Sequence, residues 1–394
     1  MLVHWIWFAM LSGLNGRQKI SLLQQYANPE DLYDLPRQAE MPPTVMEALR
    51  NKDLTRATAI QHQCTQKGIG ILTFFDSAYP ELLRRIDDPP LVLYYQGHLP
   101  DLSLRPAIGI VGTRKASPYG LRAAASLGAQ IAACGGVVIS GGAQGIDTLA
   151  LQGALENGGT TVAVMAGGLD HLYPATNKAL FKRILDKGCL LSEYPPGERC
   201  YPGNFLHRNR IISGIGNGVL VVEAPRVSGA LNTARWANEQ GRDVFAVPGN
   251  IDAESCAGSN ALLGDIARPA LNGWMVLKEY AYLYPETVAE RKILAPVSPQ
   301  ETPEKPVPAK APDKKTVDKE RNCPYSVKEK PMPVLSEQEK AVVELLGQTP
   351  IPVDQLMDQL DIPPAEIMNI VTRLTLKGVA QSHPGKLVSL KFGG

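Results

Sequence analysis

The chain has 394 residues, which is too long for one ordinary hydrophobic core, so we expect roughly two to four folded units. Hydrophobic residues make up 44% of the chain and charged residues 20%, a composition typical of a soluble globular protein. The formal net charge of +1 excludes a surface that is basic throughout. If the protein binds nucleic acid, its basic residues must therefore be concentrated locally.

The cysteines and the N-terminal residues indicate the compartment. Six cysteines are scattered along the chain, with no Cys-x-x-Cys pair and no histidine at metal-ligand spacing. This pattern predicts reduced structural thiols, no bound metal and a cytoplasmic protein. The apolar opening, Val3 to Leu11, has no Lys or Arg before it and no cleavage site after it, and it is too short to span a bilayer. It predicts a buried first helix and no membrane anchor.

Residues 1–70 are expected to form a small helical module, because short helical stretches alternate there with Pro and Gly. A helix-hairpin-helix around the turn from Gly13 to Gly16 could place backbone N–H groups on a phosphate. The alternative is a small packing module of the SAM type. The sequence favours packing, because few basic residues flank the turn.

Residues 71–285 are expected to form an α/β domain with an extended Rossmann-like parallel sheet. Short apolar runs alternate there with helical stretches that end in glycine, such as residues 119–135. This alternation predicts βαβ crossovers and a sheet with helices on both faces. The expected strands are residues 107–111, 137–140, 161–166, 189–193, 219–224 and 243–249.

The remaining residues are expected to form a linker and a second folded unit. Residues 286–333 carry many prolines among charged residues and few large apolar ones, which predicts a semi-extended linker. In residues 334–394, a Ser-x-x-Glu capping box at Ser336–Glu339 begins the first of three expected helices. A two-strand hairpin turning at Pro384–Gly385 follows. Three helices and a hairpin are typical of a winged helix.

The candidate site residues follow the expected strands, since ligands of a parallel α/β sheet bind outside the carboxyl ends of its strands. Gly112, Thr113 and Arg114 follow the first strand; a glycine allows close backbone approach and an arginine suits phosphate. No Gly-x-Gly-x-x-Gly is present, so no dinucleotide cofactor is expected.

Glycine-rich loops follow three further strands. Ser140, Gly141 and Gly142 open a helix and predict a phosphate-cradling loop, in which Asp147 is expected to orient the backbone rather than do chemistry. No Walker-type lysine is present, which argues against nucleotide hydrolysis and leaves no cofactor to expect. The later loops supply Gly168, Ser228 and Gly229. Glu223, at a strand end, is either catalytic or a holder of loop N–H groups.

The segment from residue 204 to residue 214 gives the sharpest signal. Phe205 precedes Arg208, Asn209 and Arg210, so an aromatic ring and cations alternate on a short stretch. Such a pattern suits single-stranded nucleic acid, because cations meet phosphates and a ring stacks on a base. We therefore predict a DNA-binding site at this sheet edge and no catalytic residues.

Nine segments, in order, resemble the DNA-processing protein A family, also called DprA or Smf. They read GIVGTRKAS-YG, VISGGAQGID, GGLDHLYPATN, LSEYPPG, RNRIISG, VLVVEA, SGALNTA, RDVFAVPGN and GSNALL, within about residues 70–275. The resemblance implies single-stranded DNA binding without a cofactor, protection of incoming DNA and loading of RecA during natural transformation. It also implies a homodimer. It places Arg114, Phe205, Arg208 and Arg210 in the DNA pocket.

Two departures and two competing functions accompany this interpretation. Gln144 stands where the family usually has arginine, and Leu151 where it has histidine. An alternative function is that of the lysine-decarboxylase-like phosphoribohydrolases, but the glutamate of their loop is missing after Thr233. A duplex-specific regulator acting through the winged helix is weakened by the mixed charges Glu366, Arg373 and Lys377 on its candidate recognition helix.

Overall fold

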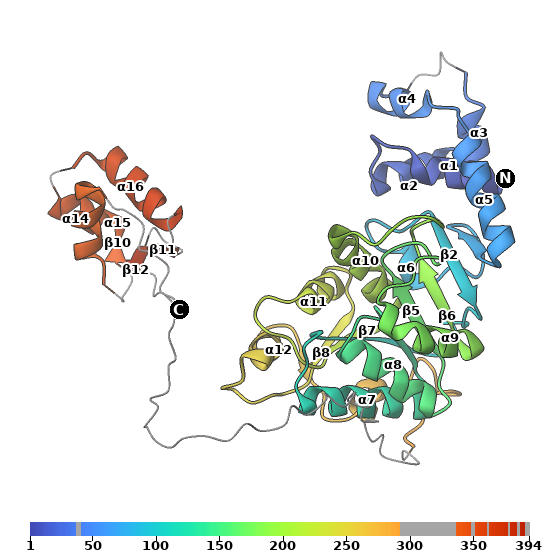
Figure 1. The fold of residues 1–394 in the computed structure, drawn as a ribbon. Helices are drawn as coiled ribbons and strands as arrows, with labels where there is room; N and C mark the ends of the chain where they lie inside the picture. Colours follow the sequence, from blue (N-terminus) through green and yellow to red (C-terminus); the bar gives the residue numbers. More distant parts are fainter. Residues whose placement is uncertain are drawn as a thin grey trace, which may run out of the picture. The chain divides into compact units, whose positions relative to one another are not determined.

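The structure, a computed structural model, describes residues 1–36, 41–291, 336–347, 351–360, 362–376, 379–383 and 387–390. The described residues belong to two compact units that divide between Lys305 and Pro306 (Figure 1). Most of the expected linker, residues 292–333, lies outside the described residues.

The N-terminal part of the first unit is helical. Its helices are α1 (Leu2–Met10), α2 (Gly16–Gln25), α3 (Pro29–Tyr33), α4 (Pro43–Leu49) and α5 (Thr55–Lys67). Trp7 and Phe8 of α1 are almost fully buried, so the prediction of a buried first helix is confirmed. Asn15 begins α2 with a capping box, because its side chain accepts from the backbone of Gln18 and the Gln18 side chain accepts in return. No described helix is long and apolar enough to cross a membrane.

The core of the first unit is a nine-stranded sheet in the order β1-β2-β6-β5-β4-β3-β7-β8-β9. All six expected apolar runs form its strands, and from β6 to β9 every pair is parallel, so the predicted Rossmann-like core is confirmed. β1 and β2 add an antiparallel edge that the sequence analysis did not predict. The strands are β1 (Gly70–Thr73), β2 (Val92–Gly97), β3 (Ala107–Val111), β4 (Val137–Ser140), β5 (Thr161–Met165), β6 (Cys189–Ser192), β7 (Gly218–Val221), β8 (Asp243–Ala246) and β9 (Arg268–Pro269).

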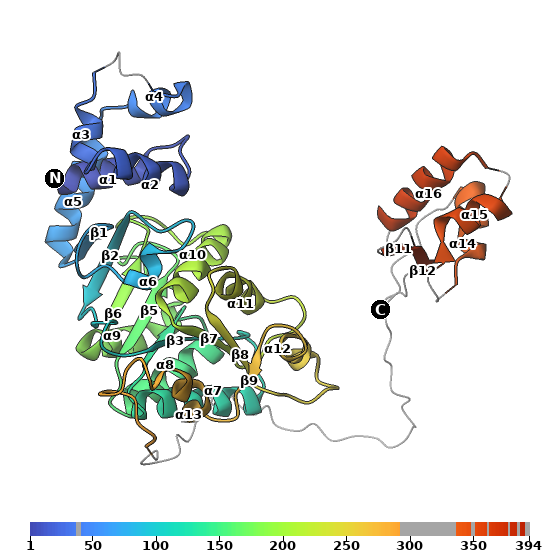
Figure 2. The same cartoon turned by 180° about the vertical axis from the view of Figure 1, so that it is seen from behind.

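Helices cover both faces of this sheet (Figures 1 and 2). The chain moves outward from β3 to β6 through α7 (Pro118–Ala133), α8 (Ile146–Glu156) and α9 (Lys178–Lys187), then returns to β7 through α10 (Pro202–Ile215). Because parallel crossovers are right-handed, this reversal places α10 and α11 (Gly229–Glu239) on the opposite face. The strand order reverses between β3 and β7, which is where such sheets bind ligands.

The packed part of the first unit continues after the sheet. It includes α6 (Glu81–Arg84), α12 (Ala257–Leu263) and α13 (Gly273–Leu277), with short 3-10 helices η1 (Ala175–Asn177), η2 (Glu254–Cys256) and η3 (Lys278–Tyr280). Val288 is only 6% exposed, and the Thr287 hydroxyl donates to the Leu104 carbonyl at 2.9 Å. The folded core therefore extends past residue 285.

The second unit has the winged-helix arrangement expected from the sequence. Ser336 caps its first helix with a capping box to Glu339, as predicted. β10, β12 and β11 form a three-stranded sheet, of which the short β10 was not predicted. The turn expected at Pro384–Gly385 lies outside the described residues. The elements are α14 (Glu337–Leu345), β10 (Ile351–Pro352), α15 (Val353–Gln359), α16 (Pro364–Leu376), β11 (Ala380–His383) and β12 (Leu387–Leu390).

Candidate functional site

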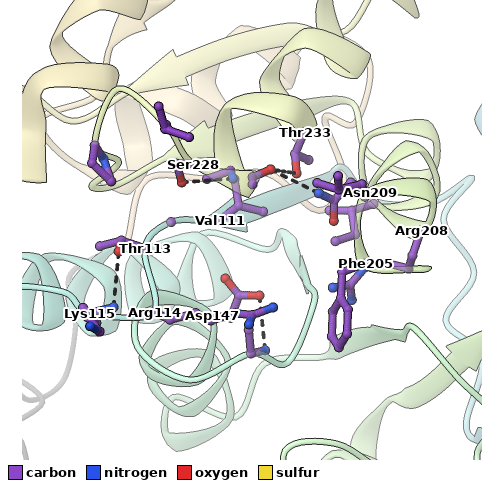
Figure 3. A pocket seen from close by; sticks show the side chains of 18 of the residues that line it. Val111, Thr113, Arg114, Lys115, Asp147, Phe205, Arg208, Asn209, Ser228 and Thr233 are labelled. Carbon is purple, nitrogen blue, oxygen red and sulfur yellow. Dashed lines mark hydrogen bonds between the residues drawn. The ribbon is translucent and has the colours of Figure 1, made fainter. Parts of the chain in front are cut away.

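A cleft of about 890 Å³ opens at the carboxyl ends of β3 and β7, where the strand order reverses. We call it the strand-end cleft. The end of β3, the start of α10 and the start of α11 contribute most of its walls, and their side chains converge around one space (Figure 3). Eight of the thirteen predicted site residues line it: Gly112, Thr113, Arg114, Phe205, Arg208, Asn209, Ser228 and Gly229.

Arg114 and two aromatic rings form one contiguous group in the cleft. The Arg114 guanidinium lies 5.1 Å from the centre of the Phe205 ring, within the range of a cation–π contact. The Tyr173 ring meets Phe205 edge-on, with centroids 5.8 Å apart. Arg114 is exposed and Tyr173 is 51% exposed, so both can reach a ligand. This group offers a positive charge beside a surface that can stack a planar base.

Arg208 is the buried cation of the cleft. Its side chain is 3% exposed, and its Nη1 donates to the carbonyls of Gly141, at 2.9 Å, and Val164. Its buried Nε–H has no hydrogen-bond partner among the described residues. Burial and the charge of Arg114 lower the pKa of Arg208 to about 10, against the opposing effect of Asp147. Arg208 is thus charged at neutral pH and only partly compensated, which favours binding of an anion.

Asp147 holds the loop after β4, as predicted. Its Oδ2 accepts from the backbone N–H groups of Gly141, at 3.1 Å, and Ala143, at 3.3 Å. Burial raises the pKa of Asp147, while the Arg208 charge and these hydrogen bonds act to lower it. Because both N–H groups point at the protein's own carboxylate, they are not available to cradle a phosphate. Gly141 serves the cleft indirectly: a Cβ there would lie 2.6 Å from Nη2 of Arg208.

Glu223, the residue for which the sequence left two roles open, holds a loop. Its carboxylate accepts from the backbone N–H of Ser117, at 3.1 Å, and from the Ser117 hydroxyl, at 2.8 Å. Its backbone carbonyl accepts from Thr113 at 2.7 Å. These contacts fix the loop that carries Arg114, which is the loop-holding role of the two that the sequence allowed.

The N-terminus of α11 points its positive end at the cleft. Ser228 caps it by accepting from the Ala230 N–H at 3.2 Å. Asn209 of α10 donates to the Gly229 carbonyl at 3.1 Å and to the Asn232 side chain at 3.3 Å, so it ties the two helices together. An N-terminus of this kind stabilises an anion placed near it.

Five predicted site residues do not line the cleft. Ser140 is buried and donates to the Ile110 carbonyl at 2.7 Å. Gly141 and Gly142 lie behind the lining, and Gly168 packs under the backbone of Pro195. Arg210 lies elsewhere, because its guanidinium is paired with Glu193 through hydrogen bonds of 2.9 and 2.7 Å. The structure therefore does not bring Arg210 together with Arg114 and Arg208.

The structure adds lining residues that sequence reasoning missed. Tyr173 was noted in the sequence only as part of a loop, although its place after β5 could have marked it as a second ring. Leu206, Ile212 and Val227 supply apolar wall, and no local pattern distinguishes them from core or surface residues. The observed lining of the cleft is therefore more apolar than the lining predicted from the sequence, which consisted mainly of glycines and arginines.

Comparison with known proteins assigns the family. Residues 70–281, more than half of the chain, match the family model of DNA recombination-mediator protein A, and residues 327–386 match the DprA winged helix domain. The chain belongs to the DNA recombination-mediator protein A family. The family resemblance found in the sequence is confirmed.

Individual relatives agree with this assignment. The protein Smf of Synechocystis is 43% identical over 54% of this chain and 54% of its own length. The DNA processing protein DprA of Streptococcus pneumoniae is 41% identical over 53% of this chain and 74% of its own length. The X-ray structure of that DprA superposes with a TM-score of 0.62 at 34% identity, covering 71% of this chain and 98% of its own. The chain thus matches only about half the length of the Synechocystis relative.

Proposed function

We propose that the protein binds single-stranded DNA in the strand-end cleft and acts as a recombination mediator rather than an enzyme. The observation that carries this proposal is that Arg208 and the Arg114–Phe205–Tyr173 group line one cleft. Cations and stacking rings at one place are what a flexible strand with unstacked bases needs.

Each part of the cleft has a role in this proposal. Arg208 and the N-terminus of α11 would hold a phosphate inside the cleft, and Arg114 would hold one at its mouth. Phe205, supported edge-on by Tyr173, would stack a base. None of these groups reads a base edge, so binding should depend little on sequence.

The cleft favours a single strand over a duplex for a geometric reason. The ring of Phe205 is half-buried in the cleft wall, so a base must leave its stack to reach it. The winged helix does not supply a basic reading face among its described residues, since Arg373 of α16 is paired with Glu339 at 3.6 Å. We propose that this unit contributes partner contact rather than duplex recognition.

The cleft is poorly equipped for hydrolysis. Its buried carboxylate, Asp147, is occupied with the loop after β4, and Glu223 is occupied with Ser117. Glycosidic cleavage, the alternative enzymatic function, requires a carboxylate beside the substrate. Neither is free for that role, which leaves the solvent-exposed Glu254 as the remaining carboxylate of the cleft lining. The absence of a free buried carboxylate among the described residues of the cleft supports the proposal of a binding protein.

Membership of the family supports a wider role. We propose that the protein acts in the cytoplasm as a homodimer, protects incoming single-stranded DNA and loads RecA onto it during natural transformation. A RecA strand-exchange assay on DNA coated by a single-strand-binding protein, with and without this protein, tests loading. Light scattering of the full chain tests the dimer.

The binding proposal is tested by a mobility shift with one oligonucleotide as single strand and as duplex, each with and without ATP. We expect the single strand to bind more tightly at matched salt, with no effect of ATP, because no Walker-type lysine is present. Equal or tighter binding of the duplex would contradict the proposal. Release of free base from a nucleoside monophosphate would restore the enzymatic alternative.

A further inference from the structure

A second group of charges lies on the other side of α10, against the N-terminal helices. Its members are Asp88, Glu193, His207 and Arg210, which we call the Arg210 cluster. They line a cavity of about 570 Å³ together with residues of α1 and α2 such as Met10 and Lys19. The cluster therefore sits where the N-terminal helices meet the α/β core.

Arg210 is the centre of this cluster. Its side chain is 2% exposed, and its two terminal nitrogens donate to the two carboxylate oxygens of Glu193 at 2.9 and 2.7 Å. Its Nε donates to the backbone carbonyl of Asp88, at 3.0 Å, and to the Asp88 carboxylate, at 3.2 Å. This fork leaves Arg210 neutralised and fixes the rotation of α10 about its axis.

Asp88 in turn lies directly under the first residue of α2. A Cβ placed on Gly16 would stand 1.9 Å from Oδ1 and 3.3 Å from Cα of Asp88, so the two residues are in close contact. The neighbouring Arg17 pairs with Asp87 at 2.5 Å, but both of those side chains are mostly exposed. The N-terminal helices thus reach α10 through the Asp88 carboxylate.

α10 carries this contact to the strand-end cleft. Arg208 and Arg210 are two residues apart, which turns their side chains about 200° from one another around the helix. One face of α10 therefore holds the Arg210 cluster, while Phe205, Arg208 and Asn209 line the cleft.

We infer that Arg210 is a positioning residue, and that the N-terminal helices set the DNA affinity of the strand-end cleft through Gly16, Asp88 and Arg210. The inference rests on the proposed binding of single-stranded DNA. Displacement of the Asp88 carboxylate releases one of the two acidic partners of Arg210. Arg210 then keeps its bonds to Glu193 and to the Asp88 carbonyl. The rotation of α10 that keeps Arg208 and Phe205 in register with Arg114 is therefore fixed less firmly.

The test compares two neighbouring carboxylates in the full chain. Asp88→Asn and Asp87→Asn each remove one negative charge from the same loop, but only Asp88 contacts Arg210. Removing a negative charge should by itself strengthen DNA binding slightly. We expect Asp88→Asn instead to weaken single-strand binding by about 3- to 10-fold, and Asp87→Asn to leave it unchanged or slightly tighter. The slope of affinity against salt should stay that of the unsubstituted protein, since no phosphate contact is removed.

Gly16→Ala tests the same route from the N-terminal helices. The added methyl forces the Asp88 side chain to turn, so this variant should weaken binding to a similar extent. Gly264→Ala is its control, because that glycine is exposed, has φ of −84° and would meet only a carbonyl at 3.6 Å. The double variant Gly16→Ala, Asp88→Asn should bind as weakly as the single variants, since both act on one contact.

The outcomes separate this inference from the proposed function. If the unsubstituted protein does not bind single-stranded DNA, the proposed function and the inference both fail. If it binds, and Asp88→Asn binds as tightly as Asp87→Asn, only the inference is overturned. Should Gly16→Ala fail to fold, the pair of aspartate variants still decides, because the Asp88 side chain is 45% exposed and tolerates the amide.

Discussion

The strand-end cleft and the Arg210 cluster are both built on arginines of one short segment of α10, yet the two guanidiniums have opposite surroundings. Arg210 has two carboxylates within 3.2 Å and uses all of its nitrogens on them or on backbone carbonyls. Arg208 reaches only carbonyls and leaves its Nε without a partner among the described residues. The first arginine is part of the scaffold, and we propose that the second binds a phosphate of the DNA.

The contrast shows that a sequence motif does not by itself assign a role to each of its residues. Two arginines separated by one asparagine look equivalent in sequence, and both suggested phosphate contacts. What distinguishes them is the count of carboxylates that the fold brings near each one.

The largest effect should come from removing Arg210. Arg210→Ala leaves Glu193 and Asp88 without their cation, so we expect the free energy of unfolding of the first unit to fall by about 3–5 kcal/mol. Denaturant unfolding monitored by tryptophan fluorescence measures it. Arg56→Ala, at an exposed arginine of α5, should change stability by less than about 0.5 kcal/mol. A similarly small effect of Arg210→Ala would remove the scaffold role assigned to it.

A smaller effect, on binding rather than stability, should come from the stacking ring. Phe205→Ala should weaken single-strand binding by about 1–3 kcal/mol, because a base loses its stacking surface. Phe205→Trp should retain most of the affinity. The matched control is Leu206→Ala, which removes apolar surface from the next residue in the cleft without removing a ring. Equal losses in Phe205→Ala and Leu206→Ala would indicate that stacking is not the source of the affinity.

An effect of acid should follow from Glu193. Burial acts to raise the pKa of Glu193, but the Arg210 guanidinium and the His207 contact lower it to about 2. Because this folded-state pKa lies below the ordinary value of 4.5, Glu193 stabilises the fold above about pH 4.5 and the contribution is lost as the pH falls toward 2.

The measurement is the free energy of unfolding between pH 5 and pH 3. Glu193→Gln should lose about 1–2 kcal/mol less over this range than the unsubstituted protein, since the amide does not titrate. Glu254→Gln, at an exposed carboxylate on the cleft, should behave as the unsubstituted protein does. Identical pH dependence in Glu193→Gln would show that the carboxylate is not held by Arg210.

The smallest effect should come from removing the second unit. The strand-end cleft and the Arg210 cluster both lie in the first unit, whose packed residues extend to Val288. A chain ending at Arg291 should therefore keep its single-strand affinity within about threefold, with any larger loss confined to cooperative binding. Titration of the full chain and of the shortened chain against the same oligonucleotide measures this difference in affinity. A loss of more than about tenfold would move part of the site into the winged helix.

Much of the fold could be predicted because local patterns of apolar residues and glycines indicate its strands and helices. Six buried apolar runs identified six of the seven parallel strands, all but the two-residue β9, and their ends identified the loops that meet in the cleft. The antiparallel edge was missed because β1 and β2 are only partly buried, so their sequences lack the continuous apolar run of the central parallel strands. Length was not the limiting signal, since β1 and the predicted β4 both have four residues and β2 has six.

The site was predicted less completely than the fold. The site residues that were wrongly predicted have their hydrogen-bond or ion-pair partners outside the segment in which they lie. The two carboxylates that pair with Arg210 lie 17 residues (Glu193) and 122 residues (Asp88) before it in sequence, so the Arg-Asn-Arg segment itself does not identify them. The loop after β4 has the glycines of a phosphate cradle, but the Asp147 carboxylate already occupies two of its N–H groups. The sequence predicted that Asp147 orients this loop, but not that its carboxylate takes up the N–H groups expected to face a phosphate.

The most direct test of the account is the salt dependence of single-strand binding by the unsubstituted protein and by the double variant Arg114→Ala, Arg208→Ala. If both arginines hold phosphates, the double variant should bind more weakly, and the slope of log affinity against log salt should be shallower by about 0.7 for each arginine removed. Circular dichroism must show the fold intact. An unchanged affinity and slope in the folded double variant would contradict the assignment of the strand-end cleft as the DNA site.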